Sequence, residues 1–139
     1  MIRRIAILAG IGLGLLGMTA AITLIALEGD EVVLLRATSP DGGVHEARVW
    51  IVEDAGTPWI EVADADKSFY RAMMARRSVE IVRRGEARSY RPVPVRSDEA
   101  HARLRGLLRA KYGWADRWIG VLVDTSDSIP VRLDPIALD

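Results

Sequence analysis

The stretch that decides the fold is HEARVWIVEDAGTPWIEVA, residues 45–63. Its first half alternates with a period of two, the pattern of a β-strand with two unlike faces. One face carries Ala47, Val49 and Ile51, and the other carries Arg48, Trp50 and Val52. Residues 54–57, Asp-Ala-Gly-Thr, then turn the chain into a second β-rich run at 59–63. The stretch therefore predicts an antiparallel hairpin.

Elements of the same kind extend outward from this hairpin. Residues 31–38 are β-rich and end in the turn signal SPDGG at 39–43, so the three runs predict an antiparallel meander. A short helix should follow, with Asp64 or Asp66 as its N-cap. Residues 78–84 and 88–95 predict a second hairpin around Gly85-Glu86. Prolines at 92 and 94 donate no ladder hydrogen bond, so its second strand should be an edge or fray there.

The C-terminal third predicts two helices and a closing strand. Ser97 is the expected N-cap of a helix that ends at Gly113, and residues 114–123 continue with another helical turn or two. Residues 129–133 alternate as a final strand. The order βββ-α-ββ-α-α-β predicts the fold class: α+β, a small antiparallel β-barrel with flanking helices.

An apolar segment precedes this domain. Residues 5–27 carry no charge, and 23 residues at about 1.5 Å each cross a bilayer core of about 30 Å. We therefore expect a transmembrane anchor at 1–28 and a barrel domain at 29–139. A cleaved signal peptide is the alternative, with Arg3-Arg4 as its charged start and Thr19-Ala20-Ala21 as a weak cleavage site. The apolar run exceeds the ~7–15 residues of a signal core, which favours the anchor.

The flanking charges predict the topology. Arg3 and Arg4 precede the segment, and Glu28, Asp30 and Glu31 follow it. The positive-inside rule places the N-terminus in the cytoplasm and the domain on the extracytoplasmic side of the cytoplasmic membrane. Lipid along residues 5–27 is then a partner of the chain.

Composition excludes several classes of function. The 19 basic and 19 acidic residues cancel, so nucleic-acid binding has no electrostatic support. The absence of cysteine excludes disulfides, thiolate metal sites and thiol catalysis. The two histidines stand outside any metal-ligand spacing, so we expect no metal site. Residues 12–17 spell GxGxxG, but no strand precedes them, and a dinucleotide fingerprint needs one.

Five short strings resemble the flavin-binding split-barrel superfamily, which includes pyridoxamine-phosphate-oxidase-like proteins. Within it, the resemblance is to deazaflavin-dependent nitroreductases. The strings are RVWIVED (48–54), SFYRAM (68–73), RSYR (88–91), KYG (111–113) and IPVRLDP (129–135). Together they span nearly the whole domain, from about Val32 to Pro135, and they imply a split barrel that binds FMN or a deazaflavin coenzyme. A second copy of the chain and a lipid-soluble substrate are further candidate partners.

The resemblance also implies candidate cofactor-binding residues. Arg48 and Trp50 lie on the strand that faces the flavin in this superfamily, where a guanidinium can hold phosphate and an indole can cover the ring. The pairs Tyr70–Arg71 and Lys111–Tyr112 match positions that line the pocket. Each has a structural alternative, such as Tyr70 packing the short helix and Lys111 at a helix C-terminus.

One loop departs from the superfamily pattern. Deazaflavin-dependent members carry a Thr-Gly-Arg-Lys-Ser-Gly-type loop after the first strand, and here residues 38–43 read TSPDGG. The glycines remain, the cations are missing and Asp41 is added. Two functions therefore compete. One is a membrane-anchored oxidoreductase that reduces a quinone or nitro compound, and the other is a non-catalytic binding module that has lost its cofactor.

Overall fold

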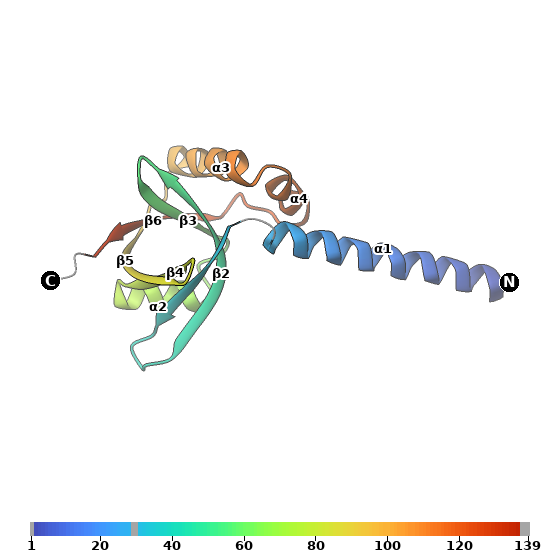
Figure 1. Ribbon diagram of the computed structural model, residues 1–139, viewed down its shortest axis with the longest axis horizontal. Coiled ribbons are helices and arrows are strands. Elements are labelled where there is room, and N and C mark those ends of the chain that lie inside the picture. The colour runs from blue at the N-terminus through green and yellow to red at the C-terminus, as the bar shows by residue number, and fades with distance from the viewer. Residues whose placement is uncertain (1, 29–30, 137–139) are drawn as a thin grey trace.

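The computed structural model describes residues 2–28 and 31–136. A long helix, α1, projects away from a domain in which strands form a barrel with helices around it (Figure 1). The domain has the predicted α+β class and the predicted order of elements. The helices are α1 (Ile2–Glu28), α2 (Ser68–Arg76), α3 (Asp98–Tyr112) and α4 (Trp114–Leu122). The strands are β1 (Val32–Thr38), β2 (Val44–Asp54), β3 (Thr57–Val62), β4 (Val79–Arg83), β5 (Glu86–Pro94) and β6 (Ile129–Pro135).

The six strands close into one barrel in the order β1-β2-β3-β6-β5-β4. Every neighbouring pair is antiparallel. The predicted meander and second hairpin supply three of these pairings, and β6 joins β3 to β5. Closure leaves no free sheet edge, which removes the usual route to edge-to-edge aggregation.

Alternating side chains fill the barrel. Val33, Leu35 and Ala37 of β1 point inward, as the period of two requires. The helix α2 joins the end of β3 to the start of β4 and packs Tyr70 and Met73 into the same core. It therefore closes that end of the barrel.

A second core lies outside the barrel, under α3 and α4. Val52 on the outer face of β2 packs with Leu104, Leu108 and Tyr112 of α3, and Ala26 of α1 joins them. The structure thus uses both faces of β2, one for each core. In Figure 1, α3 covers one side of the barrel and α4 lies beside the end of α1.

Local signals place most turns and caps correctly. Ser97 Oγ accepts a hydrogen bond from the backbone N–H of Ala100 at 3.1 Å, which confirms the predicted N-cap. The turn of the second hairpin is Arg84-Gly85, so the prediction of Gly85-Glu86 is wrong by one residue. Arg84 (φ 52°) and Gly85 (φ 82°) both adopt positive φ, as a two-residue hairpin turn of type I′ requires.

Of two other local predictions, the one for β5 is correct in part and the N-cap of α2 is wrong. The strand β5 pairs with β4 up to Tyr90 and with β6 from Tyr90 to Pro94, so it is an edge only along the stretch that holds Pro92 and Pro94. Its prolines lie past the last residue paired with β4, so their missing N–H groups interrupt nothing there. The helix α2 begins at Ser68 after Lys67, without a side-chain cap. Asp64 Oδ1 instead accepts the N–H of Asp66 at 2.8 Å and holds the turn before the helix.

The helix α1 contains an apolar segment, Ile7–Ala26, with a mean hydropathy of 2.0. In the described part of the chain it is the helix long and apolar enough to cross a membrane. Signal sequences share this length and composition. Its packing against the domain is confined to its C-terminal end, where Ala26 is buried.

Candidate functional site

The outer faces of β1 and β4 present a small apolar strip. Since Val33 and Leu35 point into the barrel, Val32 and Leu34 point outward. Val82 of β4 pairs with Leu34 and shares its face. These three outward side chains are half-buried, so solvent reaches the strip.

Two of the predicted cofactor residues flank this strip. Arg48 pairs with Leu34 and Trp50 pairs with Val32 in the β1–β2 register, so both belong to the same outer face. The Arg48 side chain is exposed and that of Trp50 is half-buried. We call Val32, Leu34, Arg48, Trp50 and Val82 the outer platform.

The indole of Trp50 has a fixed neighbour. Its ring stacks on that of Tyr112, with centroids 4.4 Å apart and planes 9° apart. The Tyr112 hydroxyl accepts the backbone N–H of Ile51 at 3.1 Å and donates to the carbonyl oxygen of Glu31 at 2.7 Å. Tyr112 therefore ties α3 to β2 and to the segment just before β1.

A charged network stands beside this stack. The Glu31 carboxylate accepts two hydrogen bonds from Arg83, at 2.5 and 2.8 Å, and one from Lys111 Nζ at 2.6 Å. Lys111 also donates to the carbonyl oxygen of Ile51 at 2.5 Å. The Arg83 hydrogen bond, aided by Lys111, outweighs burial and lowers the pKa of Glu31 to about 2. Glu31 is therefore ionised at neutral pH and neutralises much of the local positive charge.

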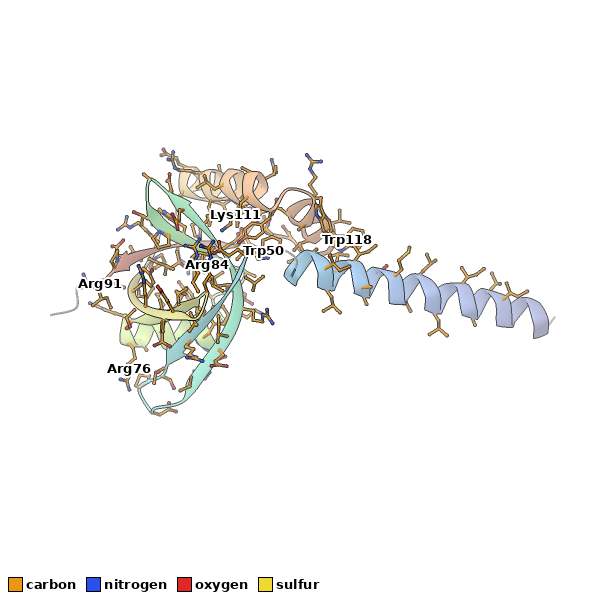
Figure 2. All side chains as sticks on the ribbon, in the orientation of Figure 1. Trp50, Arg76, Arg84, Arg91, Lys111 and Trp118 are labelled. Atoms are coloured by element: carbon orange, nitrogen blue, oxygen red, sulfur yellow. The ribbon has the colours of Figure 1, made fainter. Side chains whose placement is uncertain are left out.

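One arginine beside this network, Arg84, is largely exposed to solvent. The Arg84 side chain is 83% exposed, and its guanidinium lies 3.8 Å from the Glu31 carboxylate. In the view of Figure 2, Arg84, Lys111 and Trp50 are labelled near the middle of the domain, with Trp50 nearest to α1. Because Glu31 precedes Val32 directly, Arg84 stands at the Val32 end of the outer platform.

The barrel end formed by the β4–β5 turn opens as a cavity of about 400 Å³. Its apolar floor consists of Ile51 and Ile81, and its other lining residues are Glu53, Arg83, Arg84, Glu86, Arg88 and Tyr90. Arg83 donates to Glu53 at 2.7 Å as well as to Glu31, so it bridges the cavity rim and the network. The cavity and the outer platform meet at Arg84.

The structure does not bring the six predicted site residues together. Trp50, Lys111 and Tyr112 form one unit with Arg48 beside it, whereas Tyr70 and Arg71 lie on α2. Tyr70 is buried in the barrel core, and its hydroxyl is 3.5 Å from an Arg96 nitrogen. The Arg71 side chain is exposed. In Figure 2 the labelled Arg76 at the end of α2 lies far from Trp50.

In the glycine-containing loop after β1, residues 39–43, the Asp41 carboxylate accepts hydrogen bonds from the loop itself. Asp41 accepts hydrogen bonds from the Ser39 hydroxyl and from the backbone N–H of Gly43, which lower its pKa. The N–H of Gly42 donates to Ser39 O at 2.9 Å. These amides are therefore occupied, and a phosphate at this loop would also meet the charge of Asp41.

The donor set of the outer platform fits a planar anionic ligand. Val32, Leu34 and Val82 provide an apolar floor, Trp50 borders it, and the exposed Arg48 and Arg84 stand at its ends. This is the chemistry of a flavin or deazaflavin coenzyme. Within residues 2–28 and 31–136, no three His, Cys, Asp or Glu side chains gather in a way that could hold a metal.

Sequence reasoning did not single out Glu31, Arg83 or Arg84 as site residues. Lys111 and Glu31 are 80 positions apart, and Arg83 and Glu31 are 52 apart. No local pattern marks such contacts.

No family model and no curated protein matches this chain. Several solved structures match it in fold. The heme storage protein HutZ from Vibrio cholerae aligns with a TM-score of 0.61 at 12% identity, covering 81% of this chain and 87% of HutZ. A candidate pyridoxamine 5′-phosphate oxidase from Listeria innocua aligns with a TM-score of 0.57 at 12% identity, covering 86% and 94%. An F420 reductase aligns with a TM-score of 0.51 at 19% identity, covering 82% and 93%.

These similarities, all below 25% identity, concern the fold. They agree with the closed six-stranded barrel and with the resemblance found in the sequence strings. The chain has the fold of the flavin-binding split-barrel superfamily of pyridoxamine-phosphate-oxidase-like proteins.

Proposed function

We propose that this protein is a membrane-anchored split-barrel oxidoreductase. It would hold FMN or a deazaflavin coenzyme on the outer platform and reduce a hydrophobic acceptor such as a quinone or a nitro compound. The observation that carries the proposal is the short link between α1 and the platform. Val32, a platform residue that pairs with Trp50, follows Glu28, the last residue of α1, by four positions.

The platform residues have distinct roles in this proposal. Arg48 and Arg84 would each offer charge-assisted hydrogen bonds to the coenzyme, one at each end of the platform. The apolar floor and Trp50 orient its ring system and keep water from one side of it. The bound coenzyme supplies hydride or electron transfer, as cofactors of this class do. Lys111 and Tyr112 act by positioning, since they fix Trp50 and Glu31.

The membrane anchor defines the class of acceptor. Val32 follows Glu28 by four residues, which span at most about 14 Å, and Glu28 is two residues past the end of the apolar segment, so the platform lies close to that end. A lipid-soluble acceptor that leaves the bilayer would meet the platform before the α2 end of the barrel. This proximity favours quinones and nitroaromatic compounds over polar substrates.

The test is an absorbance spectrum of the full chain purified in mild detergent, followed by an acceptor assay. A visible band of flavin or deazaflavin, bleached on reduction and restored by a quinone, would support the proposal. A protein that binds neither coenzyme, as purified or after incubation with each, would refute it.

The second candidate is a non-catalytic membrane-tethered module on the same fold. The closed loop at Asp41 favours it, because the amides that hold phosphate in the resembled proteins are occupied here. The stacking of Tyr112 on Trp50 also favours it, because one face of the indole is already covered. The absence of coenzyme binding in the experiment above would leave this candidate standing.

A further inference from the structure

The short helix α4 is apolar on two sides. Ala115, Trp118 and Ile119 pack into the second core. The adjoining side exposes Trp114 (54% exposed) and Val121 (80% exposed), which are seven residues apart and thus share a face. Leu122 and Val123 continue this exposed apolar surface. Outside α1, six large hydrophobic side chains of the described residues are exposed, and these four are among them.

This exposed face lies next to the membrane-side end of the domain. Trp118 Nε1 donates a hydrogen bond to Thr23 Oγ1 of α1 at 3.0 Å. Thr23 is inside the apolar segment Ile7–Ala26, three residues from its end, or about 4.5 Å along the helix axis. Figure 2 shows Trp118 at the junction of the domain with α1. The helix α4 is therefore level with the last turn of the segment that would span the bilayer.

The charges of α4 suit a lipid surface. Its single acid, Asp116, is turned inward, 3% exposed, and bound by Arg105 at 2.5 Å. Its single base, Arg117, is exposed on the side of the helix that carries Trp114 and Val121. The outer face thus offers apolar side chains and one cation. This combination is typical of helices that lie in the headgroup region, and tryptophan is enriched there.

We infer that α4 is an interfacial helix that inserts Trp114, Val121 and Leu122 into the bilayer surface beside α1. The inference rests on the membrane anchoring proposed above, because α1 defines where the bilayer begins. A second contact at α4 fixes which side of the barrel faces the lipid, and it holds the outer platform at a set height above the membrane.

The chain contains no cysteine, so single labels can be introduced cleanly. The full chain would be reconstituted in vesicles of phosphatidylcholine and phosphatidylglycerol, with an environment-sensitive fluorophore at Val121→Cys. Val44→Cys is the matched control, since Val44 is 62% exposed and lies on the β1–β2 hairpin, away from α1. Leu16→Cys, in the middle of α1, reports the anchor itself.

Brominated lipids should quench the labels at positions 16 and 121 and leave position 44 bright, while aqueous iodide should quench position 44. Quenching at position 16 without quenching at position 121 would overturn the interfacial helix and leave the anchor intact. Protection of position 121 from both quenchers would also overturn it, because a protein would then cover this face. A label at position 16 that lipid does not quench would overturn the anchoring on which the inference rests.

Discussion

The ring of Tyr112 lies flat against the indole of Trp50, 4.4 Å away, and its hydroxyl joins Glu31 O to the N–H of Ile51. A single side chain of α3 thus fixes a predicted cofactor residue and the start of β1. Tyr112 is 1% exposed, so its hydroxyl cannot turn to water instead. Trp50 and Tyr112, two of the residues suggested by the family resemblance, therefore have a structural role.

The Tyr112 hydroxyl should therefore contribute more to the free energy of unfolding than a typical tyrosine hydroxyl does. Tyr112→Phe keeps the stack but leaves the buried N–H of Ile51 without its partner, which should cost about 1–3 kcal/mol in the free energy of unfolding. Urea unfolding of the full chain in detergent, followed by tryptophan fluorescence, measures it. Tyr70→Phe is the matched control, because its hydroxyl has only a 3.5 Å contact, and it should change stability little. Equal effects of the two substitutions would contradict this role.

Glu31 should make stability depend on acid pH. Its pKa in the folded protein is about 2, below its ordinary value of 4.5, so the carboxylate stabilises the fold above about pH 5. That stabilisation is lost as the pH falls toward 2. Glu31→Gln should therefore cost about 1–2 kcal/mol at pH 7, after allowance for solvent screening, and almost nothing at pH 2.

Unfolding of the wild type and of Glu31→Gln across pH 2–7 would show the two stabilities converging. Glu46→Gln serves as the control, because its partner Arg36 is a surface residue, and both side chains are more than 40% exposed. A difference between wild type and Glu31→Gln that stays constant with pH would show that the ionised carboxylate is not the stabilising group.

Arg105 of α3 should contribute strongly to stability. Its side chain, 14% exposed, binds Glu61 at 2.7 Å and Asp116 at 2.5 Å. Arg105→Ala would leave the buried Asp116 with Arg109, 4.0 Å away, and the half-buried Glu61 with Ser128, and it should cost about 3–5 kcal/mol. Arg103→Ala, which breaks the exposed pair with Asp54 on the same helix, should have a much smaller effect. Thermal unfolding of the two variants measures the difference. A similar loss of stability in Arg105→Ala and Arg103→Ala would contradict the stabilising role of Arg105.

The arginines before the apolar segment predict that the domain lies outside the cytoplasm. Protease added to intact spheroplasts should digest the domain and spare a cytoplasmic marker protein. Replacing Arg3 and Arg4 with glutamate should reduce the digested fraction. Full protection of the wild-type domain would reverse the topology.

Local chemistry made much of this fold predictable. The Asp54–Thr57 turn, the Ser97 cap and the alternation around Trp50 each leave a pattern within a few residues, and each is confirmed. The pairing of β1 with β4 and the network at Glu31 depend on residues 40 to 80 positions apart, and no short pattern encodes them. Pro92 is predictable only in part. Its missing N–H signals a strand with one unpaired side, and the barrel gives it a neighbour on β6 and none on β4, but no local pattern identifies β6 as that neighbour.

The most direct test of the central claim is a titration of the purified full chain with FMN and with the deazaflavin coenzyme. At least one should bind, and Arg48→Ala and Trp50→Ala should each weaken it. The loss of a charge-assisted phosphate contact at Arg48 corresponds to about 1.5–3 kcal/mol, or roughly 10- to 150-fold in Kd. Arg103→Ala, on α3 and paired with Asp54, should leave the affinity unchanged. Binding that survives both platform substitutions would move the site elsewhere, and no binding of either coenzyme by the wild type would contradict the enzyme hypothesis.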